Sequence, residues 1–198
     1  MTLFVKGGHM SEQEIEEGKI VIASAGLLIY RKVDGAVEVL TAQRQNKPWE
    51  GYTTVDFSGL VKKSDRTVKD AAIREGGEET GGTLNFIIKH LIGIYGPQRF
   101  WHELKRRGSD LAAVATAAPI SNKYFVATFF AAEVISGEPT ANREMQDFRF
   151  VSPLALADEG AKLNFDGALV LADFWWKIRY DPSWLDPRVT RWIYGSFD

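Results

Sequence analysis

The pattern of hydrophobic and polar positions divides the 198-residue chain into predicted strands and helices. Lys19–Arg31 is an almost unbroken run of β-branched and aliphatic residues, which is typical of a buried strand. Asp34-Gly35 is a hairpin signal, and a second strand is expected after it over Ala36–Arg44. Gln45–Gly51 is polar and predicts a loop. A β-hairpin is therefore expected over residues 19–44.

Further segments have the composition of strands: Thr53–Phe57, Thr83–Tyr95, Lys123–Ile135 and Phe148–Val151. In the first of them Asp56 stands between Val55 and Phe57, so alternation along a strand predicts that its side chain faces the other way. Gly137-Glu138-Pro139 predicts a turn after the third.

Thr67–Gly82, with the sequence TVKDAAIREGGEETGG, has the three-and-four spacing of a helix. Thr67 with Asp70 predicts a capping-box start, and Gly81 is a natural stop. Gly76 and Gly77 each cost about 1 kcal/mol relative to alanine inside a helix. We therefore expect that close backbone approach requires both glycines.

The predicted helix carries acids on its packed face. At about 100° per residue, Glu75 and Glu79 follow the line of Ala71 and Ala72, with Glu78 at its edge. Partly buried carboxylates repel one another and lose hydration, so they need a cation to share. Oxygen-only ligands suit a hard ion such as Mg²⁺ or Mn²⁺. The alternative is a solvated acidic helix end, the usual meaning of adjacent glutamates.

An arginine lies beside these acids. Asp70, Arg74 and Glu78 are spaced four residues apart, so Arg74 is placed to orient the carboxylates and offset their charge.

Two more helices are expected after residue 151. Ser152-Pro153 is a helix cap followed by proline at the first helical position. Asp166 is expected to cap a second helix, whose packed residues would be Leu169, Val170, Ala172, Phe174 and Trp175. The segment Asp181–Asp198 is too aromatic for a disordered tail, and is expected to fold back or pair with a partner chain.

Composition narrows the classes of function. The 24 basic and 26 acidic residues give a net charge of −2, which argues against broad nucleic-acid affinity. The chain has no cysteine, so neither thiolate chemistry nor a disulfide framework is expected. No apolar run approaches the ~20 residues that span a bilayer, and residues 1–10 lack the apolar core of a signal peptide. We expect a cytoplasmic protein with a flexible extension over residues 1–18.

The run Arg74-Glu75-Gly76-Gly77-Glu78-Glu79-Thr80-Gly81 resembles the core of the Nudix box, G-x5-E-x7-R-E-U-x-E-E-x-G-U, where U is a bulky aliphatic residue. The matching residues are Arg74, Glu75, Glu78, Glu79 and Gly81. The chain departs from the pattern at both U positions, which hold Gly76 and Gly82.

The loop before this core also departs from the pattern. Gly59 lies one residue too far upstream, so either Leu60 replaces the box glycine or the loop carries one extra residue. The upstream glutamate of the box then falls on Arg66 or, with the insertion, on Asp65.

The resemblance implies a fold and a chemistry. The implied fold is an α/β/α sandwich over a mixed sheet, in one domain over residues 19–198, whereas periodicity alone predicts only a single α/β domain. It implies that Glu75, Glu78 and Glu79 bind the metal, with the backbone carbonyl near Gly59 or Leu60 completing the shell. Divalent ions neutralise a phosphoanhydride and lower the pKa of bound water, and a carboxylate accepts the proton.

The resemblance also suggests catalytic and substrate residues. Glu144, ahead of the strand Phe148–Val151, resembles the acid that the family places before its last strand and is the candidate base. In the family the first hairpin leads to the substrate, so Arg44 and Lys47 are candidate phosphate contacts. Ordinary surface charge is the alternative for each of them.

The segment Gly96–Asn122 is longer than an average connection and is a candidate lid, with short helices expected over Gln98–Arg107 and Leu111–Ala118. Its Arg99 and Trp101 are suited to holding phosphates and stacking on a base, while a core or dimer contact is the alternative for Trp101.

Pro97 follows Gly82 by fifteen residues, a spacing that resembles ADP-ribose pyrophosphatases. The expected substrate is therefore ADP-ribose or another nucleotide sugar. A nucleoside triphosphate is the alternative substrate. A ligand-sensing or interaction module that has lost catalysis is the alternative of another class, and a homodimer is left open.

Overall fold

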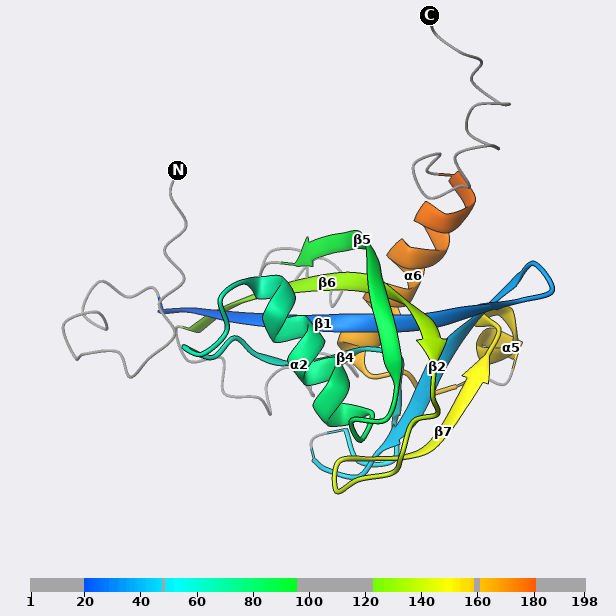
Figure 1. Ribbon diagram of the computed structural model, residues 1–198, viewed down its shortest axis with the longest axis horizontal. Coiled ribbons are helices and arrows are strands. Elements are labelled where there is room, and N and C mark those ends of the chain that lie inside the picture. Colours follow the sequence, from blue (N-terminus) through cyan, green and yellow to red (C-terminus); the bar gives the residue numbers. More distant parts are fainter. Residues whose placement is uncertain (1–19, 48, 96–122, 159–160, 181–198) are drawn as a thin grey trace, which may run out of the picture.

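The computed structural model describes residues 20–47, 49–95, 123–158 and 161–180. Its centre is a mixed sheet with the strand order β3-β2-β1-β6-β5, in which β4 also pairs with β1 and β7 with β2 (Figure 1). Strands β1 and β6 run parallel, and the other pairs run antiparallel. The strands are β1 (Ile20–Val33), β2 (Ala36–Arg44), β3 (Thr53–Thr54), β4 (Phe57–Leu60), β5 (Asn85–Tyr95), β6 (Lys123–Ser136) and β7 (Met145–Val151).

Helices cover both faces of the sheet. The described helices are α2 (Val68–Glu79), α5 (Pro153–Asp158) and α6 (Phe165–Tyr180). Along β1, Leu27 packs in the same core cluster as Ala71 of α2, whereas Leu28 packs with Phe174 of α6. Since successive strand residues point to opposite faces, α2 and α6 lie on opposite sides of the sheet. This explains why the first strand is hydrophobic throughout, and it confirms the α/β/α sandwich.

The predicted first hairpin is confirmed. Asp34 and Gly35 both have positive φ, at 49° and 83°, and Val33 pairs with Ala36 across the turn. This turn geometry matches the twist of the two strands, and β2 has the predicted bounds.

The strand predicted over Thr53–Phe57 is broken. Strand β3 ends at Thr54, and β4 begins at Phe57 and pairs with β1 instead of β2. As a result Val55 and Phe57 belong to different core clusters, on opposite faces of the sheet. Asp56 lies in the break and is 1% exposed. Simple strand alternation therefore gave the wrong surroundings for this carboxylate.

The helix starts were predicted in part. Ser152 accepts a hydrogen bond at Oγ from the N–H of Ala155, which confirms the cap of α5. Helix α6 begins at Phe165, so the cap predicted at Asp166 was wrong and Asn164 precedes the helix instead. Leu169, Val170 and Phe174 are buried as predicted. Ala172 is exposed and Trp175 only half-buried, because α6 covers the sheet with a narrower face than the sequence indicated.

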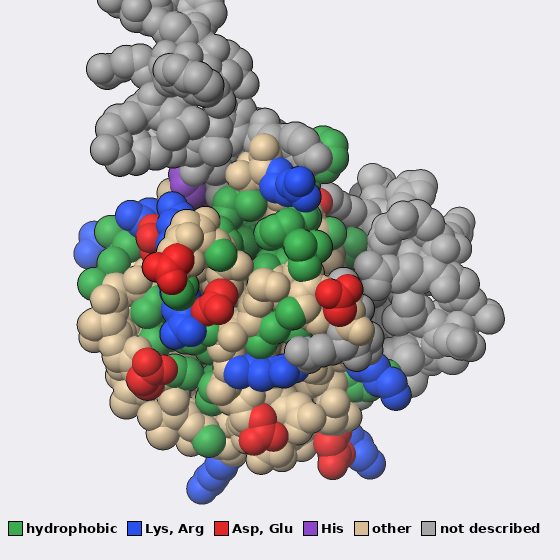
Figure 2. Space-filling model, turned by 90° about the vertical axis from the view of Figure 1, so that its right-hand side faces the viewer, with side chains coloured by type: hydrophobic (Ala, Val, Ile, Leu, Met, Phe, Trp, Pro, Cys, Tyr) green, Lys and Arg blue, Asp and Glu red, His purple; other side chains and the backbone are tan. Residues whose placement is uncertain are grey.

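Other predicted segments fall outside the described residues: the extension 1–18, the helices predicted at 98–107 and 111–118, and the segment 181–198. Within the described residues, no helix is long and apolar enough to cross a membrane. Figure 2 shows acidic and basic side chains interspersed on the end of the molecule that it draws.

Candidate active site

Helix α2 holds three glutamates at the edge of the sheet. Thr67 caps its start, because its Oγ accepts from the N–H of Asp70 at 3.1 Å, as predicted. Ala71 and Ala72 are fully buried against the sheet. One and two turns later the same line carries Glu75 and Glu79 inward, so that Glu79 is 5% exposed.

Arg74 is the centre of a charged network beside this line. Its Nε and Nη2 donate to the two carboxylate oxygens of Asp65, at 3.0 and 2.9 Å. Nη2 also donates to the backbone carbonyl of Leu60 at 2.9 Å, and Nη1 pairs with Glu75 and Glu78. The predicted pairing with Glu78 is confirmed, but the second acid of the network is Asp65 and not Asp70. The hydrogen bonds from Arg74 lower the pKa of Asp65 to about 2.

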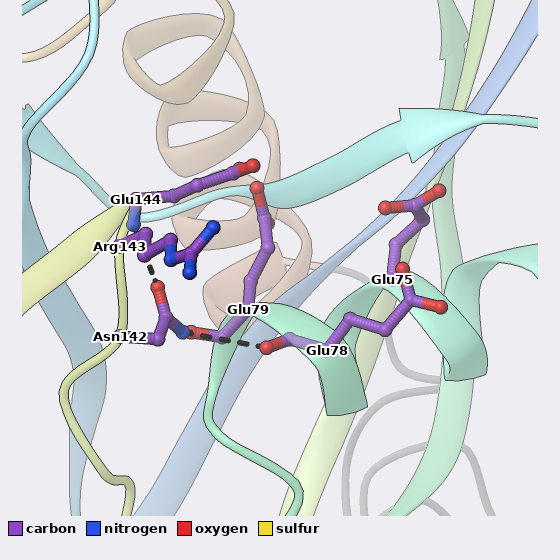
Figure 3. Close-up of a pocket in the computed structure, with 6 residues that line it drawn as sticks. All are labelled: Glu75, Glu78, Glu79, Asn142, Arg143 and Glu144. Atoms are coloured by element: carbon purple, nitrogen blue, oxygen red, sulfur yellow. Dashed lines mark hydrogen bonds between the residues drawn. The ribbon is translucent and has the colours of Figure 1, made fainter.

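A cavity of about 280 Å³ lies where the C-terminal half of α2 meets the loop before β7 (Figure 3). It is lined by Glu75, Glu78, Glu79, Asn142, Arg143 and Glu144. In Figure 3 the Glu79 and Glu144 side chains extend toward one another, whereas Glu75 points away from them. The structure therefore brings the predicted base, Glu144, beside the most buried acid of the helix.

The surroundings of Glu79 disfavour the ionised form of its carboxyl group. Burial raises its pKa well above the usual value, and the nearby Asp56, Glu144 and Glu75 raise it further, while Arg44 opposes this shift. Its Oε2 is buried and has no hydrogen-bond partner. A buried acceptor without a partner is costly, so this oxygen is available to a ligand.

A second buried polar cluster lies behind Glu79. Asp56 accepts hydrogen bonds at Oδ1 from Thr54 at 2.9 Å and from Asn164 at 2.8 Å, and at Oδ2 from Ser58 at 3.3 Å. Burial raises the pKa of Asp56, and the hydrogen bonds from Asn164 and Thr54 together with Arg44 oppose this shift only in part. The Nε of Arg44 is buried without a partner. Arg44 thus supplies positive charge to both buried carboxylates.

The NUDIX domain model matches residues 22–174. The chain belongs to the Nudix family. No curated protein sequence matches it.

Solved structures share the fold at low identity. The C. elegans Ap4A hydrolase binary complex has a TM-score of 0.52 and 21% identity, over 80% of this chain and 98% of that one. The NUDIX domain of Shewanella oneidensis NrtR, complexed with ADP ribose, has a TM-score of 0.51 and 15% identity, over 85% and 99%. A UDP-X diphosphatase has a TM-score of 0.52 and 13% identity, over 86% and 71%. The predicted family, fold and enzyme class, a Nudix-type pyrophosphohydrolase, are confirmed.

The structure favours one of the two registers for the Nudix box loop. Asp65 makes the two-point contact to Arg74, whereas Arg66 is exposed. A Cβ atom at Gly59 would lie 2.3 Å from the carboxyl carbon of Glu75, so a larger residue there would displace this carboxylate. Both observations favour a box that starts at Gly59 and contains one extra residue.

The two glycines inside α2, Gly76 and Gly77, differ in the space that surrounds them. A Cβ at Gly76 would lie 2.5 Å from Cδ1 of Leu27 and 3.4 Å from Cζ of Phe86, in agreement with the predicted close approach. A Cβ at Gly77 would meet nothing within 4 Å. The packing interpretation of Gly77 was therefore wrong, because this position points away from the sheet.

The Nudix glutamates do not converge in the structure. Within the described residues, no group of three or more acidic or histidine side chains is arranged to hold one ion. Glu75 and Glu78 are turned to Arg74, and Glu79 extends toward Glu144. The donor set nevertheless fits a hard divalent ion, because the three carboxylates line one cavity and Oε2 of Glu79 lacks a partner.

The predicted substrate residues have different outcomes. Arg44 lies close enough to Glu79 to affect its pKa. Lys47 is exposed and is not among the residues that line the cavity. Arg99 and Trp101 lie outside the described residues.

Sequence reasoning missed Asn142 and Arg143, which line the cavity from the loop before β7. Their position directly before Glu144 was the available signal.

Proposed function

We propose that the protein catalyses divalent-metal-dependent hydrolysis of a phosphoanhydride bond in a nucleoside diphosphate linked to another moiety. The observation that carries this proposal is Glu79, a buried carboxylate with an unpartnered oxygen, in a cavity that it shares with Glu75, Glu78 and Glu144. Such a cavity is poorly suited to an uncharged ligand, and it is suited to a divalent ion together with a polyphosphate.

The Nudix glutamates would hold the metal. Glu75, Glu78 and Glu79 supply carboxylate oxygens, and the backbone carbonyl of Gly59 would complete the shell. Mg²⁺ or Mn²⁺, when bound, neutralises phosphate charge and lowers the pKa of a water ligand.

The remaining residues have distinct proposed roles. Glu144 accepts the proton of the attacking water, because its carboxylate faces the cavity from the loop opposite α2. Arg74 orients Glu75 and Glu78. Arg143 lines the cavity and Arg44 lies near Glu79, and these two cations are the proposed phosphate contacts.

Lys47 stays a candidate phosphate contact that would need to reach the cavity from outside. Arg99 and Trp101 stay candidates for the remote part of the substrate. A homodimer and a cytoplasmic location also stay predictions.

The proposed substrate class is ADP-ribose or another nucleotide sugar. The ADP ribose complex and the UDP-X diphosphatase among the structural neighbours show only that this fold accommodates such molecules. They define the compounds to test.

The test is hydrolysis of ADP-ribose, UDP-glucose, Ap4A and ATP with Mg²⁺ or Mn²⁺, with products separated by chromatography. A nucleotide sugar should be cut into a nucleoside monophosphate and a phosphorylated remainder, and EDTA should abolish the reaction. Cleavage of ATP alone would replace this proposal by a nucleoside triphosphate pyrophosphohydrolase. Binding without cleavage of any compound would indicate the ligand-sensing alternative.

A further inference from the structure

The side chain of Asn142 joins the loop before β7 to the end of the Nudix helix, in addition to the backbone hydrogen bond from Thr140 to the carbonyl of Thr80. Asn142 donates through Nδ2 to the backbone carbonyl of Glu79 at 2.7 Å and to that of Glu78 at 3.3 Å. Its Oδ1 accepts from the backbone N–H of Glu144 (Figure 3) and from that of Met145, both at 2.9 Å. Both donors and both lone pairs of this amide are therefore used.

The hydrogen bonds from Asn142 pair backbone carbonyl groups at the C-terminal end of α2. The last carbonyls of an α-helix have no partner inside it, and the last turn of α2 contains no basic residue to supply donors. Asn142, which lies 63 positions from Glu79, supplies a donor to the Glu79 carbonyl and shares the Glu78 carbonyl with the N–H of Gly81. The carbonyls that it pairs belong to two of the three Nudix glutamates.

The Oδ1 atom of Asn142 fixes the conformation of the loop. By accepting from the N–H groups of Glu144 and Met145, Oδ1 closes a local turn that sets where the Glu144 side chain leaves the backbone. The carbonyl of Glu144 is paired with the N–H of Gln45, and Met145 is fully buried. Glu144 is therefore held on a rigid support, and Arg143 extends from the same turn into the cavity.

The contact works against electrostatic repulsion. Glu79 and Glu144 extend toward one another and their carboxylates repel when both are ionised, so the contacts between the loop and the helix act against this repulsion. We propose that Asn142 is a positioning residue that holds Glu144 and Arg143 opposite Glu79. This inference rests on the proposed function in so far as it assigns Glu144 to the reaction.

A second attachment of the same loop offers a matched control. Thr83 donates through Oγ to the carbonyl of Glu138 at 2.6 Å and lies 3.1 Å from the hydroxyl of Thr140. It joins the same two segments but contacts neither the helix carbonyls nor the turn that carries Glu144. Thr83→Val therefore loosens the loop without removing the proposed positioning contact.

The experiment compares Asn142→Ala, Asn142→Asp and Thr83→Val. Each variant is assayed for melting temperature, for Mn²⁺ affinity by calorimetry without substrate, and for kcat and KM on the compound that the wild type cleaves fastest among ADP-ribose, UDP-glucose, Ap4A and ATP. Asn142→Ala should lower kcat by about 10- to 100-fold with a smaller change in KM, as expected for a misplaced catalytic group. Asn142→Asp keeps the turn but loses the donors to the helix, and should lower kcat similarly. Thr83→Val should keep kcat and Mn²⁺ affinity.

A double-mutant cycle separates positioning from stability. If Asn142 acts through Glu144, Asn142→Ala should lower kcat much less in a Glu144→Gln background than in the wild type. Additive effects, or equal kcat for Asn142→Ala and Thr83→Val, would overturn the inference while the function stands. If the wild type cleaves no compound, the proposed function fails. The positioning contact is then judged by Mn²⁺ affinity, which should fall in Asn142→Ala but not in Thr83→Val, and an unchanged affinity in Asn142→Ala would overturn it.

Discussion

Asp65 and Arg74 form a two-point ion pair, with Nε–Oδ1 and Nη2–Oδ2 distances of 3.0 and 2.9 Å. The loop that carries Asp65 is thereby fixed to the second turn of the Nudix helix. The same guanidinium contacts Glu75 and Glu78, so the position of Asp65 determines where Arg74 stands relative to two candidate metal ligands.

The first prediction concerns this pair. Asp65→Asn should lower kcat/KM by about 10- to 100-fold, as for other residues that orient metal ligands. Without the Asp65 carboxylate, Arg74 would stay paired with Glu75 and Glu78, and it would compete with the metal for these two glutamates. Arg66→Gln is the matched control, because Arg66 is exposed on the adjacent position. Equal activity of both variants in steady-state assays would show that the box does not depend on Asp65.

The second prediction concerns Glu79. Glu79→Gln should abolish hydrolysis, lowering kcat by about 100-fold or more, because it removes a metal ligand and a charge from the cavity. Without metal, the melting temperature should stay level or rise, since the glutamine has no charge to repel Asp56 and Glu144. Near-wild-type turnover under saturating Mg²⁺ would show that this acid is not part of the site.

The third prediction gives the pH dependence of the metal-free protein. The pKa of Glu79 is raised above 4.5 in the folded state, so the folded protein binds its proton more tightly than the unfolded chain. Its stabilising contribution is complete below the unfolded pKa and is lost as pH rises through the folded pKa. Melting curves in EDTA should therefore show a falling melting temperature above pH 4.5. If Glu79→Gln leaves the slope of melting temperature against pH unchanged, the pH dependence comes from other titrating groups.

The sequence predicts most of the elements but less of the site's polar surroundings. The Thr67 cap, the Asp34-Gly35 turn and the acids along the line of Ala71 depend on near neighbours in the chain, and the structure agrees with them. Asn142 contacts Glu79 across 63 positions, which no local pattern indicates.

Contacts between distant segments also explain the two errors near Asp56. The sheet pairs β4 with β1 and breaks the expected strand, and the Asn164 side chain donates to Asp56 across 108 positions. Neither pairing leaves a periodic signal in the sequence.

The fourth prediction compares the helix glycines. Gly77→Ala should stabilise the protein by up to about 1 kcal/mol, because a Cβ there meets nothing and alanine favours the helix. Gly76→Ala should destabilise it by about 1–3 kcal/mol, because its Cβ would press on Leu27 in a packed core. Urea unfolding of both variants provides the measurement. Stabilisation by both alanines would show that Leu27 adapts without cost.

The fifth prediction concerns the buried Asp56. In Asp56→Asn the retained oxygen still accepts from Thr54 and Asn164, and the new amide faces the Ser58 hydroxyl, which is able to accept from it. The substitution also removes a buried charge near Glu79. Because burial raises the pKa of Asp56, the stabilisation from its protonated form is lost as pH rises through that pKa.

Asp56→Asn should therefore match or exceed the wild type in metal-free stability, and by more at pH 8 than at pH 5. Asn164→Ala, which takes a donor from the same carboxylate, should cost about 1–3 kcal/mol. Urea unfolding at the two pH values measures both effects. If Asp56→Asn instead loses stability at pH 8, the ionised carboxylate is required there as the countercharge of Arg44, whose buried Nε has no hydrogen-bond partner within the described residues.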